Sequence, residues 1–290
     1  MLVIDGGMGS ELEARGAPMN HEAWCGLANL DAPDLVRAIH DDYIRAGADV
    51  IIANTFPTNR PALEAAGYGD RFEEANRAAV AAALAARDAA DRPVTVAGSM
   101  SIWGPHEEAR IEDAPPPSDV LDVYREQARL LADAGVDLIV LEMFDTRWTA
   151  ARQAARETGL PVWLGVWGRL GEDGGLETPG GRSLEDDLPA LIGDGADAVL
   201  VMHSPLDAVA PALRAVAGHW DGPRGAYPHA GHFERPNWVF KDVAPSVLAD
   251  EAEQWVRDGA TFVGGCCGTR PEHIRALRER FPAAQPAGDG

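Results

Sequence analysis

Short apolar segments rich in β-branched residues alternate with longer amphipathic segments along the chain. The apolar segments predict strands at residues 2–5, 49–56, 93–100, 136–144, 161–168, 196–203, 224–231 and 261–265. The amphipathic segments predict helices at residues 33–47, 71–89, 118–135, 147–158, 184–194, 205–217, 245–258 and 270–281. Continuous apolar strands that alternate with helices are typical of a parallel sheet covered by helices. Eight such units in 290 residues predict an α/β protein with a (β/α)8 barrel, and we expect residues 1–290 to form a single domain of this kind.

The net charge of the chain limits the classes of binding partner that we expect. The formal net charge is −21 and the calculated pI is about 4.6. A surface this acidic repels phosphate backbones, so the sequence argues against a nucleic-acid partner. The first residues show neither a basic start nor an apolar run of signal-peptide length, and no segment has the length of a membrane span. We therefore expect a cytoplasmic protein without a membrane partner, whose oligomeric state the sequence leaves open.

Two of the three cysteines are adjacent. Cys266 and Cys267 lie in the segment "TFVGGCCGTR", whereas Cys25 stands alone near the N-terminus. Three cysteines do not make a disulfide framework, and adjacent cysteines bridge poorly because a disulfide needs separated, converging Cα atoms. In a reducing compartment, metal binding or catalysis is the more frequent use of such a pair, although free cysteines also serve as small buried side chains.

Polar residues and cysteines stand at the predicted strand ends. In (β/α)8 barrels the chemistry lies at the C-terminal ends of the strands. That rule selects seven residues, namely Asp5, Asn54, Glu142, His203, His229, Cys266 and Cys267. Any one of them has an ordinary structural explanation: Asp5 as a turn cap, Glu142 as a buried carboxylate held by backbone donors, His229 as a structural histidine. Their convergence on one rim favours a functional site there.

The glycines around the cysteine pair indicate an unusual backbone. Gly264, Gly265 and Gly268 allow angles that other residues avoid, so that both sulfur atoms can turn toward one point. Two thiolates at one point need a cation, and sulfur ligands favour zinc. A catalytic zinc ion takes about three protein ligands and keeps one position open. The third ligand is then expected from another strand end, and His203 and Cys25 are the two candidates.

At these residues the chain resembles a known family. The segments "DGGMGSELEARG", "YIRAGADVIIANTF", "GVDLIVLEMF", "AYPHAG" and "GGCCGT" are similar to those of the homocysteine S-methyltransferases, zinc-dependent barrels that methylate a thiol. The resemblance covers nearly the whole chain. It implies that Cys266 and Cys267 are zinc ligands, and that Asp5, Gly6, Gly7 and Glu142 line the homocysteine pocket. From their places at the strand ends we expect Asn54 and His229 to bind substrate as well.

The chain departs from the family at two strand ends. The family carries its third zinc-ligating cysteine in a Gly-x-Asn-Cys-Thr segment after the sixth strand, where this chain has "LVMHSP". Met202 stands in place of the asparagine and His203 in place of the cysteine. The family usually has asparagine at the position of His229. A site with two cysteines and one histidine remains a reasonable zinc site, with one negative charge fewer than three thiolates.

The resemblance implies a reaction. A sulfonium or other onium donor, of the S-methylmethionine or S-adenosylmethionine type, would transfer a methyl group to the thiol of homocysteine and give methionine. Four tryptophans near the rim are candidates for a cation–π face toward the donor, namely Trp24, Trp103, Trp163 and Trp167. The changes at Met202, His203 and His229 leave two alternatives open. One is the same fold and metal with another thiol or donor, including onium demethylation, and the other is a metal-free, non-catalytic barrel.

Overall fold

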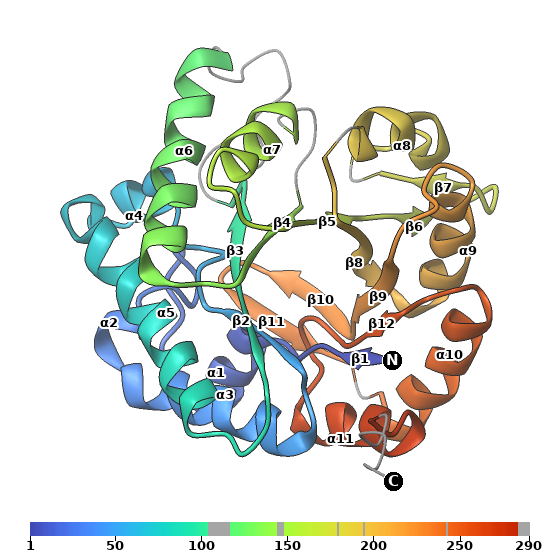
Figure 1. Cartoon of the computed structure of the whole chain (residues 1–290), viewed down its shortest axis with the longest axis horizontal. Coiled ribbons are helices and arrows are strands. Elements are labelled where there is room, and N and C mark those ends of the chain that lie inside the picture. The colour runs from blue at the N-terminus through green and yellow to red at the C-terminus, as the bar shows by residue number, and fades with distance from the viewer. Residues whose placement is uncertain (104–116, 144–147, 179, 194, 242, 284–290) are drawn as a thin grey trace, which may run out of the picture.

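The computed structural model describes residues 1–103, 117–143, 148–178, 180–193, 195–241 and 243–283. Helices surround a ring of parallel strands (Figure 1). The barrel strands are β1 (Leu2–Val3), β2 (Val50–Ala53), β3 (Thr95–Ser101), β4 (Leu138–Glu142), β5 (Val162–Val166), β8 (Ala198–Pro205), β9 (Arg224–His229) and β12 (Phe262–Val263). They pair in the order β1-β12-β9-β8-β5-β4-β3-β2, and a parallel bridge between Ile4 and Val50 joins the two ends. The predicted (β/α)8 barrel is therefore confirmed.

A helix follows each barrel strand. The helices that cover the barrel are α3 (Pro33–Ala46), α5 (Phe72–Asp88), α6 (Pro117–Ala134), α7 (Trp148–Arg156), α8 (Leu184–Ile192), α9 (Leu206–Ala217), α10 (Pro245–Arg257) and α11 (Pro271–Arg280). These are the eight predicted helices, with bounds within a few residues. The apolar stripe of each packs on the strands; in α3, for example, the buried residues include Val36, Ile39 and Tyr43.

Several short elements were not predicted. The loops after β1 and β2 contain helices α1 (Met8–Ala14), α2 (Ala28–Asp31) and α4 (Arg60–Ala65) and the 3-10 turn η1 (Gly69–Arg71). Two antiparallel hairpins are inserted after barrel strands. They are β6 (Arg169–Leu170) with β7 (Leu176–Glu177), and β10 (Gly231–Glu234) with β11 (Asn237–Phe240). The second hairpin lies beside the rim where the predicted site residues gather.

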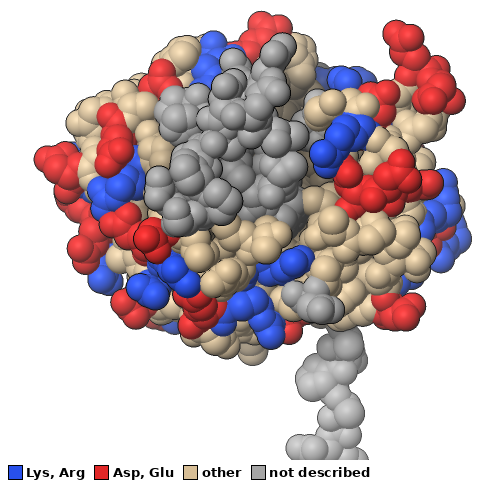
Figure 2. All heavy atoms as spheres, turned by 90° about the horizontal axis from the view of Figure 1, so that it is seen from above, with Lys and Arg blue, Asp and Glu red and all other residues tan. Residues whose placement is uncertain are grey.

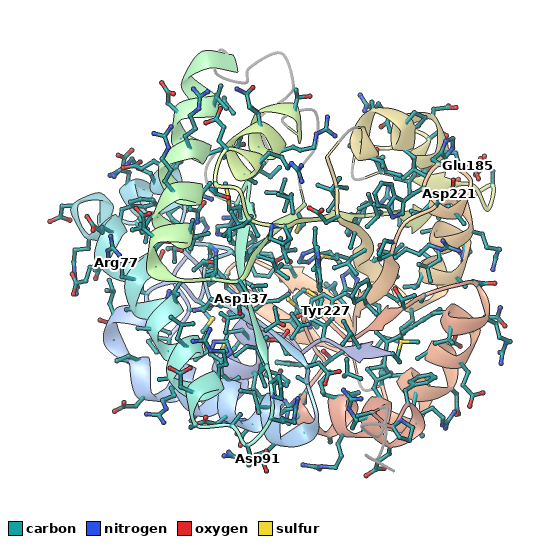
Figure 3. The ribbon with its side chains drawn as sticks, viewed as in Figure 1. Arg77, Asp91, Asp137, Glu185, Asp221 and Tyr227 are labelled. Carbon is teal, nitrogen blue, oxygen red and sulfur yellow. The ribbon has the colours of Figure 1, made fainter. Side chains whose placement is uncertain are left out.

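Most charged side chains lie on the outside, and most of the buried residues are apolar. Figure 2 shows acidic and basic side chains interspersed on one face, and in Figure 3 Tyr227 lies near the barrel centre while Arg77 and Asp91 lie at the periphery. Strands β4 and β5 are buried along their whole length, as expected for a sheet covered on both faces. Within the described ranges, no helix combines the length and apolar character needed to cross a membrane.

His40 makes folding sensitive to acid. Its side chain on α3 is fully buried, and neither ring nitrogen has a hydrogen-bond partner within the described part of the chain. Burial disfavours the imidazolium and lowers the pKa of His40 to about 3. Between about pH 6.5 and pH 3 the unfolded chain therefore binds one proton more than the folded chain, and acid destabilises the fold by up to about 1.4 kcal/mol per pH unit.

Replacing His40 by leucine is expected to flatten this pH dependence. Leucine fills the same apolar site and removes two unpaired polar atoms, so the free energy of unfolding at pH 7 should be equal or higher. Between pH 6.5 and pH 4.5 the loss of stability per pH unit should be smaller than in the wild type. Urea unfolding curves at several pH values measure the difference. Equal slopes for the two proteins would show that His40 does not contribute to acid unfolding.

Candidate active site

The ends of β8 and β12 bring a histidine and the cysteine pair together. Cys266 Sγ lies 3.2 Å from His203 Nδ1 and 3.7 Å from Cys267 Sγ. All three side chains are buried. Cys266 is the central member, in contact with both of the others. The residues predicted as metal ligands are therefore neighbours in space, although 63 positions separate His203 from Cys266 in the sequence.

These spacings can be compared with those around a zinc ion. With Zn–S bonds of about 2.3 Å and Zn–N bonds of about 2.0 Å in a tetrahedron, two sulfur ligands lie about 3.8 Å apart, and a sulfur and a nitrogen about 3.6 Å apart. The separation of the two sulfur atoms fits this geometry, and Cys266 and His203 lie slightly closer than it requires. Across the described ranges, however, no cluster of three or more His, Cys, Asp or Glu side chains has the full spacing of a metal site. The donor types and the separation of the two sulfur atoms thus fit zinc, whereas the described side chains do not have the full geometry of a metal site.

A carboxylate holds the far side of the imidazole. His203 Nε2 lies 2.8 Å from Glu142 Oε2 at the end of β4, and Ser99 Oγ donates to Glu142 Oε1. A carboxylate only accepts hydrogen bonds, so Nε2 carries the proton in the neutral ring, and the Nδ1 lone pair faces Cys266. Glu142 is buried and is placed where its negative charge favours a cation nearby.

Burial and neighbouring groups have opposite effects on the pKa values of Cys266 and His203. Burial raises the pKa of the Cys266 thiol, and the neighbouring Cys267 raises it further, whereas His203 lowers it. Burial disfavours the imidazolium of His203, but the interactions with Cys266 and Glu142 outweigh that penalty and raise the pKa of His203 to about 10. The pocket therefore stabilises a cation among these residues.

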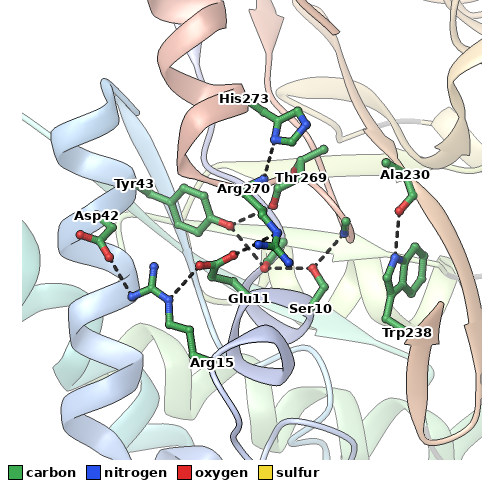
Figure 4. A network of polar contacts seen from close by, with 12 residues as sticks. Ser10, Glu11, Arg15, Asp42, Tyr43, Ala230, Trp238, Thr269, Arg270 and His273 are labelled. Atoms are coloured by element: carbon green, nitrogen blue, oxygen red, sulfur yellow. Dashed lines mark hydrogen bonds and ion pairs between the residues drawn. The ribbon is translucent and has the colours of Figure 1, made fainter. Parts of the chain in front are cut away.

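The loop that carries the cysteines is fixed by the segments around it. Gly268 has φ of 80°, and its N–H donates to Ser10 Oγ of α1. Cys266 N donates to the carbonyl of Pro228, and the carbonyl of Cys267 accepts from Ala230 N. Figure 4 shows this support, with the Tyr43 hydroxyl bonded to the carbonyl of Thr269 and Trp238 bonded to that of Ala230.

The three glycines of the motif have different roles. Gly268 adopts the left-handed conformation that the sequence predicted for the motif, whereas Gly264 and Gly265 do not. The two earlier glycines are required by close packing instead: a Cβ atom at Gly264 would lie 2.8 Å from Ile4 Cβ. The expectation of special backbone angles was therefore correct only for Gly268. Gly7 allows the segment before α1 to approach the cysteine loop, since a Cβ there would lie 2.7 Å from the Cys267 Cα.

A cavity of about 270 Å³ opens beside the cysteine pair. It is lined by most of the predicted substrate residues, namely Gly6, Gly7, Asn54, Glu142 and His229. Burial lowers the pKa of His229 to about 4, so this ring is neutral near pH 7. The described lining contains no lysine or arginine, which makes it suited to a cationic ligand.

Asp5 and Asn54 are engaged by the protein itself. Asp5 is absent from the described lining of the cavity: its carboxylate accepts from Ile52 N and from the Tyr227 hydroxyl, and burial raises its pKa well above the ordinary value. Asn54 lines the cavity while it bonds to Cys25, whose thiol donates to Asn54 Oδ1 at 3.2 Å. The geometry thus places His203, rather than Cys25, against the cysteine pair.

Aromatic rings form the mouth of the cavity. Trp24 lies with its ring centroid 5.6 Å from that of Trp103 and 5.7 Å from that of Phe233, and Phe56 lies 5.7 Å from Trp103. Of the four tryptophans predicted from the sequence, Trp24, Trp103 and Trp167 line the cavity. Trp163 packs against Phe262 of β12 instead, a strand that is not adjacent to its own. The sequence reasoning missed the aromatic residues Phe56, Tyr227, Phe233 and Trp238.

Backbone strain is concentrated around this cavity. Among the described residues, the non-glycine positions with positive φ are Trp24 (41°), Met143 (55°) and His203 (53°). All three line the cavity. Such conformations cost free energy and persist where the surrounding structure enforces them, which is frequent at functional sites. The strain therefore marks the same site as the cysteine pair does, on independent evidence.

The profile of the homocysteine S-methyltransferase family matches residues 2–281. This chain belongs to the homocysteine S-methyltransferase family. It is a methyltransferase by descent, and the resemblance seen in the sequence motifs is confirmed. The match extends across all eight barrel strands, from β1 to β12.

Relatives within the family are similar along most of their length. Homocysteine S-methyltransferase 2 of Zea mays is 28% identical, over 95% of this chain and 88% of the relative. The selenocysteine methyltransferase of Astragalus bisulcatus is 27% identical, over 98% of this chain and 93% of the relative. The crystal structure of the Escherichia coli homocysteine methyltransferase in its metallated form superposes with a TM-score of 0.79, at 26% identity, and covers 97% of this chain and 96% of that one.

Proposed function

We propose that this family member transfers a methyl group from an onium donor to the thiol of homocysteine, giving methionine, at a zinc centre held by Cys266, Cys267 and His203. The contacts of Cys266 with both Cys267 and His203, at the edge of the cavity, carry this proposal. Zinc, when bound, supplies Lewis acidity that lowers the pKa of a thiol ligand. A metallated relative of the same fold supports the choice of a metal-dependent reaction.

The donor side of the proposal rests on the aromatic mouth and on the charge of the cavity. Trp24, Phe56 and Trp103 line the cavity, and a cation over an aromatic face is attracted by the ring quadrupole. The guanidinium of Arg235 lies 4.8 Å from the centroid of Trp103, so that ring already has one cation beside it. Trp24 and Phe56 are the rings proposed for the donor. A sulfonium or quaternary ammonium donor of the S-methylmethionine or S-adenosylmethionine type is therefore favoured over an anionic or neutral one.

The remaining residues orient the reactants and exclude water. Aromatic side chains line the cavity together with Gly6 and Gly7, and the missing side chains of these glycines let Tyr43 and the cysteine loop pack against this segment. Glu142 accepts the proton of His203 Nε2, so that the unprotonated Nδ1 faces Cys266. Holding the acceptor sulfur in line with the donor methyl group supplies much of the rate enhancement expected for such a transfer.

The proposal is tested with purified, zinc-loaded protein and homocysteine. S-methylmethionine, S-adenosylmethionine and betaine are offered in turn, and methionine is quantified by mass spectrometry. We expect methionine to form with at least one sulfonium donor, and only with protein that contains zinc. Zinc-loaded protein that forms no methionine with any of these donors would overturn the proposal.

A second acceptor class is favoured by one observation. Both oxygens of Glu142, the residue that the resemblance assigns to the amino-acid pocket, already have protein partners. An acceptor that does not need an ammonium partner at this position therefore fits the site as well. A thiol of the same chain length without the amino group belongs in the same assay. If kcat/KM is higher for that thiol than for homocysteine, that thiol replaces homocysteine as the proposed acceptor.

A further inference from the structure

The imidazole of His203 is held between two groups on opposite sides. Nδ1 faces Cys266 Sγ at 3.2 Å, and Nε2 faces Glu142 Oε2 at 2.8 Å. Glu142 in turn is fixed by the hydroxyl of Ser99 from the neighbouring strand β3. The side chains of Glu142 and His203 are 5% and 11% exposed, so water competes little for these bonds.

This arrangement compensates for a strained backbone. His203 has φ of 53°, which a non-glycine residue adopts only when its surroundings enforce it. The register between β8 and β9 also shifts between Met202 and Pro205, which re-aims the side chain at the strand end. A ring on such a backbone needs a second contact to fix which nitrogen faces the sulfur atoms, and Glu142 provides that contact.

We propose that Glu142 is a positioning residue for the metal centre: it accepts the Nε2–H of His203 and thereby presents Nδ1 as a ligand beside Cys266. The inference rests on the proposed zinc function and adds a role for Glu142 that differs from binding the amino group of the acceptor. Metal-ligating histidines commonly donate their second ring N–H to a carboxylate, which fixes the tautomer and makes the ligand more basic. Loss of such a partner typically lowers metal affinity by about 10-fold to 100-fold.

A double-mutant cycle on zinc affinity tests this role without reference to activity. Four proteins are compared: the wild type, Glu142→Ala, His203→Cys and the double variant. Cysteine at position 203 has no ring to orient, so the effect of Glu142 should disappear in that background. We expect Glu142→Ala to weaken zinc binding by about 10-fold to 100-fold in the wild-type background and by less than about threefold in the His203→Cys background. Competition with a chromophoric chelator measures both affinities.

The conservative variant separates positioning from charge. In Glu142→Gln the amide oxygen still accepts from His203 Nε2, and the amide N–H₂ can donate to Ser99 Oγ. We expect this variant to retain zinc affinity within about threefold of the wild type, and to keep the visible absorption spectrum of the cobalt(II)-loaded protein. A cobalt spectrum that is altered in Glu142→Ala but unchanged in Glu142→Gln would report a change in ligand geometry. A general loss of stability would not produce this difference between the two variants.

The outcomes separate this inference from the proposed function. Equal effects of Glu142→Ala in the two backgrounds, or a loss of less than about threefold in the wild type, would overturn the positioning role while the methyl transfer stands. If the cycle shows that the effect of Glu142→Ala depends on His203, but the zinc-loaded protein methylates no thiol, the proposed function is overturned and the positioning role stands. A wild-type protein that takes up no zinc would overturn both.

Discussion

Replacement of Cys266 by serine is expected to abolish zinc binding and methyl transfer together. Cys266 is the central donor, in contact with both His203 and Cys267, and a neutral hydroxyl is a poor substitute for a thiolate. Because loss of an outer-sphere partner alone costs up to about 100-fold in affinity, loss of this ligand should cost more than about 100-fold. Zinc content after dialysis and the rate of methionine formation measure the two effects.

The matched control for this variant is Cys25→Ser. Cys25 is also buried and lines the same cavity, but its thiol donates to Asn54, a bond that a serine hydroxyl can keep. We expect Cys25→Ser to retain about one zinc ion per chain. A loss of zinc equal to that of Cys266→Ser would make Cys25 a ligand and remove His203 from the proposed set.

Replacement of Gly268 by alanine should be the most destabilising single change at the site. The residue has φ of 80°, and a Cβ atom would lie 1.8 Å from the carbonyl oxygen of Ala230. That carbonyl is held by the Trp238 indole, and neither it nor the cysteine loop can move without breaking hydrogen bonds. We expect a loss of at least about 3 kcal/mol in the free energy of unfolding, from steric overlap added to backbone strain.

Gly16→Ala isolates the conformational part of that loss. Gly16 has nearly the same φ, 83°, but a Cβ atom there meets nothing within 4 Å. Its substitution should cost only about 1–2 kcal/mol, the penalty of the left-handed conformation itself. Urea unfolding of the two variants measures the difference. Equal losses would show that the loop yields to the new side chain and that the close approach to Ala230 does not constrain it.

The barrel was predictable because strands such as β2 and β5 are apolar along their whole length and others, such as β4 and β8, are apolar up to their C-terminal ends. A strand buried on both faces leaves a continuous apolar run, and eight such runs leave few alternatives to a closed parallel barrel. The strand-end rule then placed Glu142, His203 and Cys266 on one rim without knowledge of any contact. The hairpin of β10 and β11 was not predictable in the same way, because its strands have four residues each and carry no long apolar run.

Which side chains the rim residues contact could be seen only in the structure. Adjacent residues of a strand point to opposite sides, so a shift of one position decides whether a side chain faces the cavity. Trp163 and Trp167 differ in another way: Trp163 lies within β5 and packs against Phe262, whereas Trp167 lies just beyond the end of β5 and lines the cavity. The sequence placed both Glu142 and His203 at the rim, but β5 lies between their strands, and only the closed barrel shows that the two side chains meet.

The closure of the barrel also sets the order in which the site is assembled. The seam joins β1 to β12 and β2, and the cysteine loop after β12 is bonded to Ser10 near the start of the chain. A ribosome releases the N-terminal segment first, so Glu142 and His203 emerge long before the two thiols. A growing chain therefore presents His203 without the cysteine pair, and the proposed metal site is complete only once the last strand closes the ring.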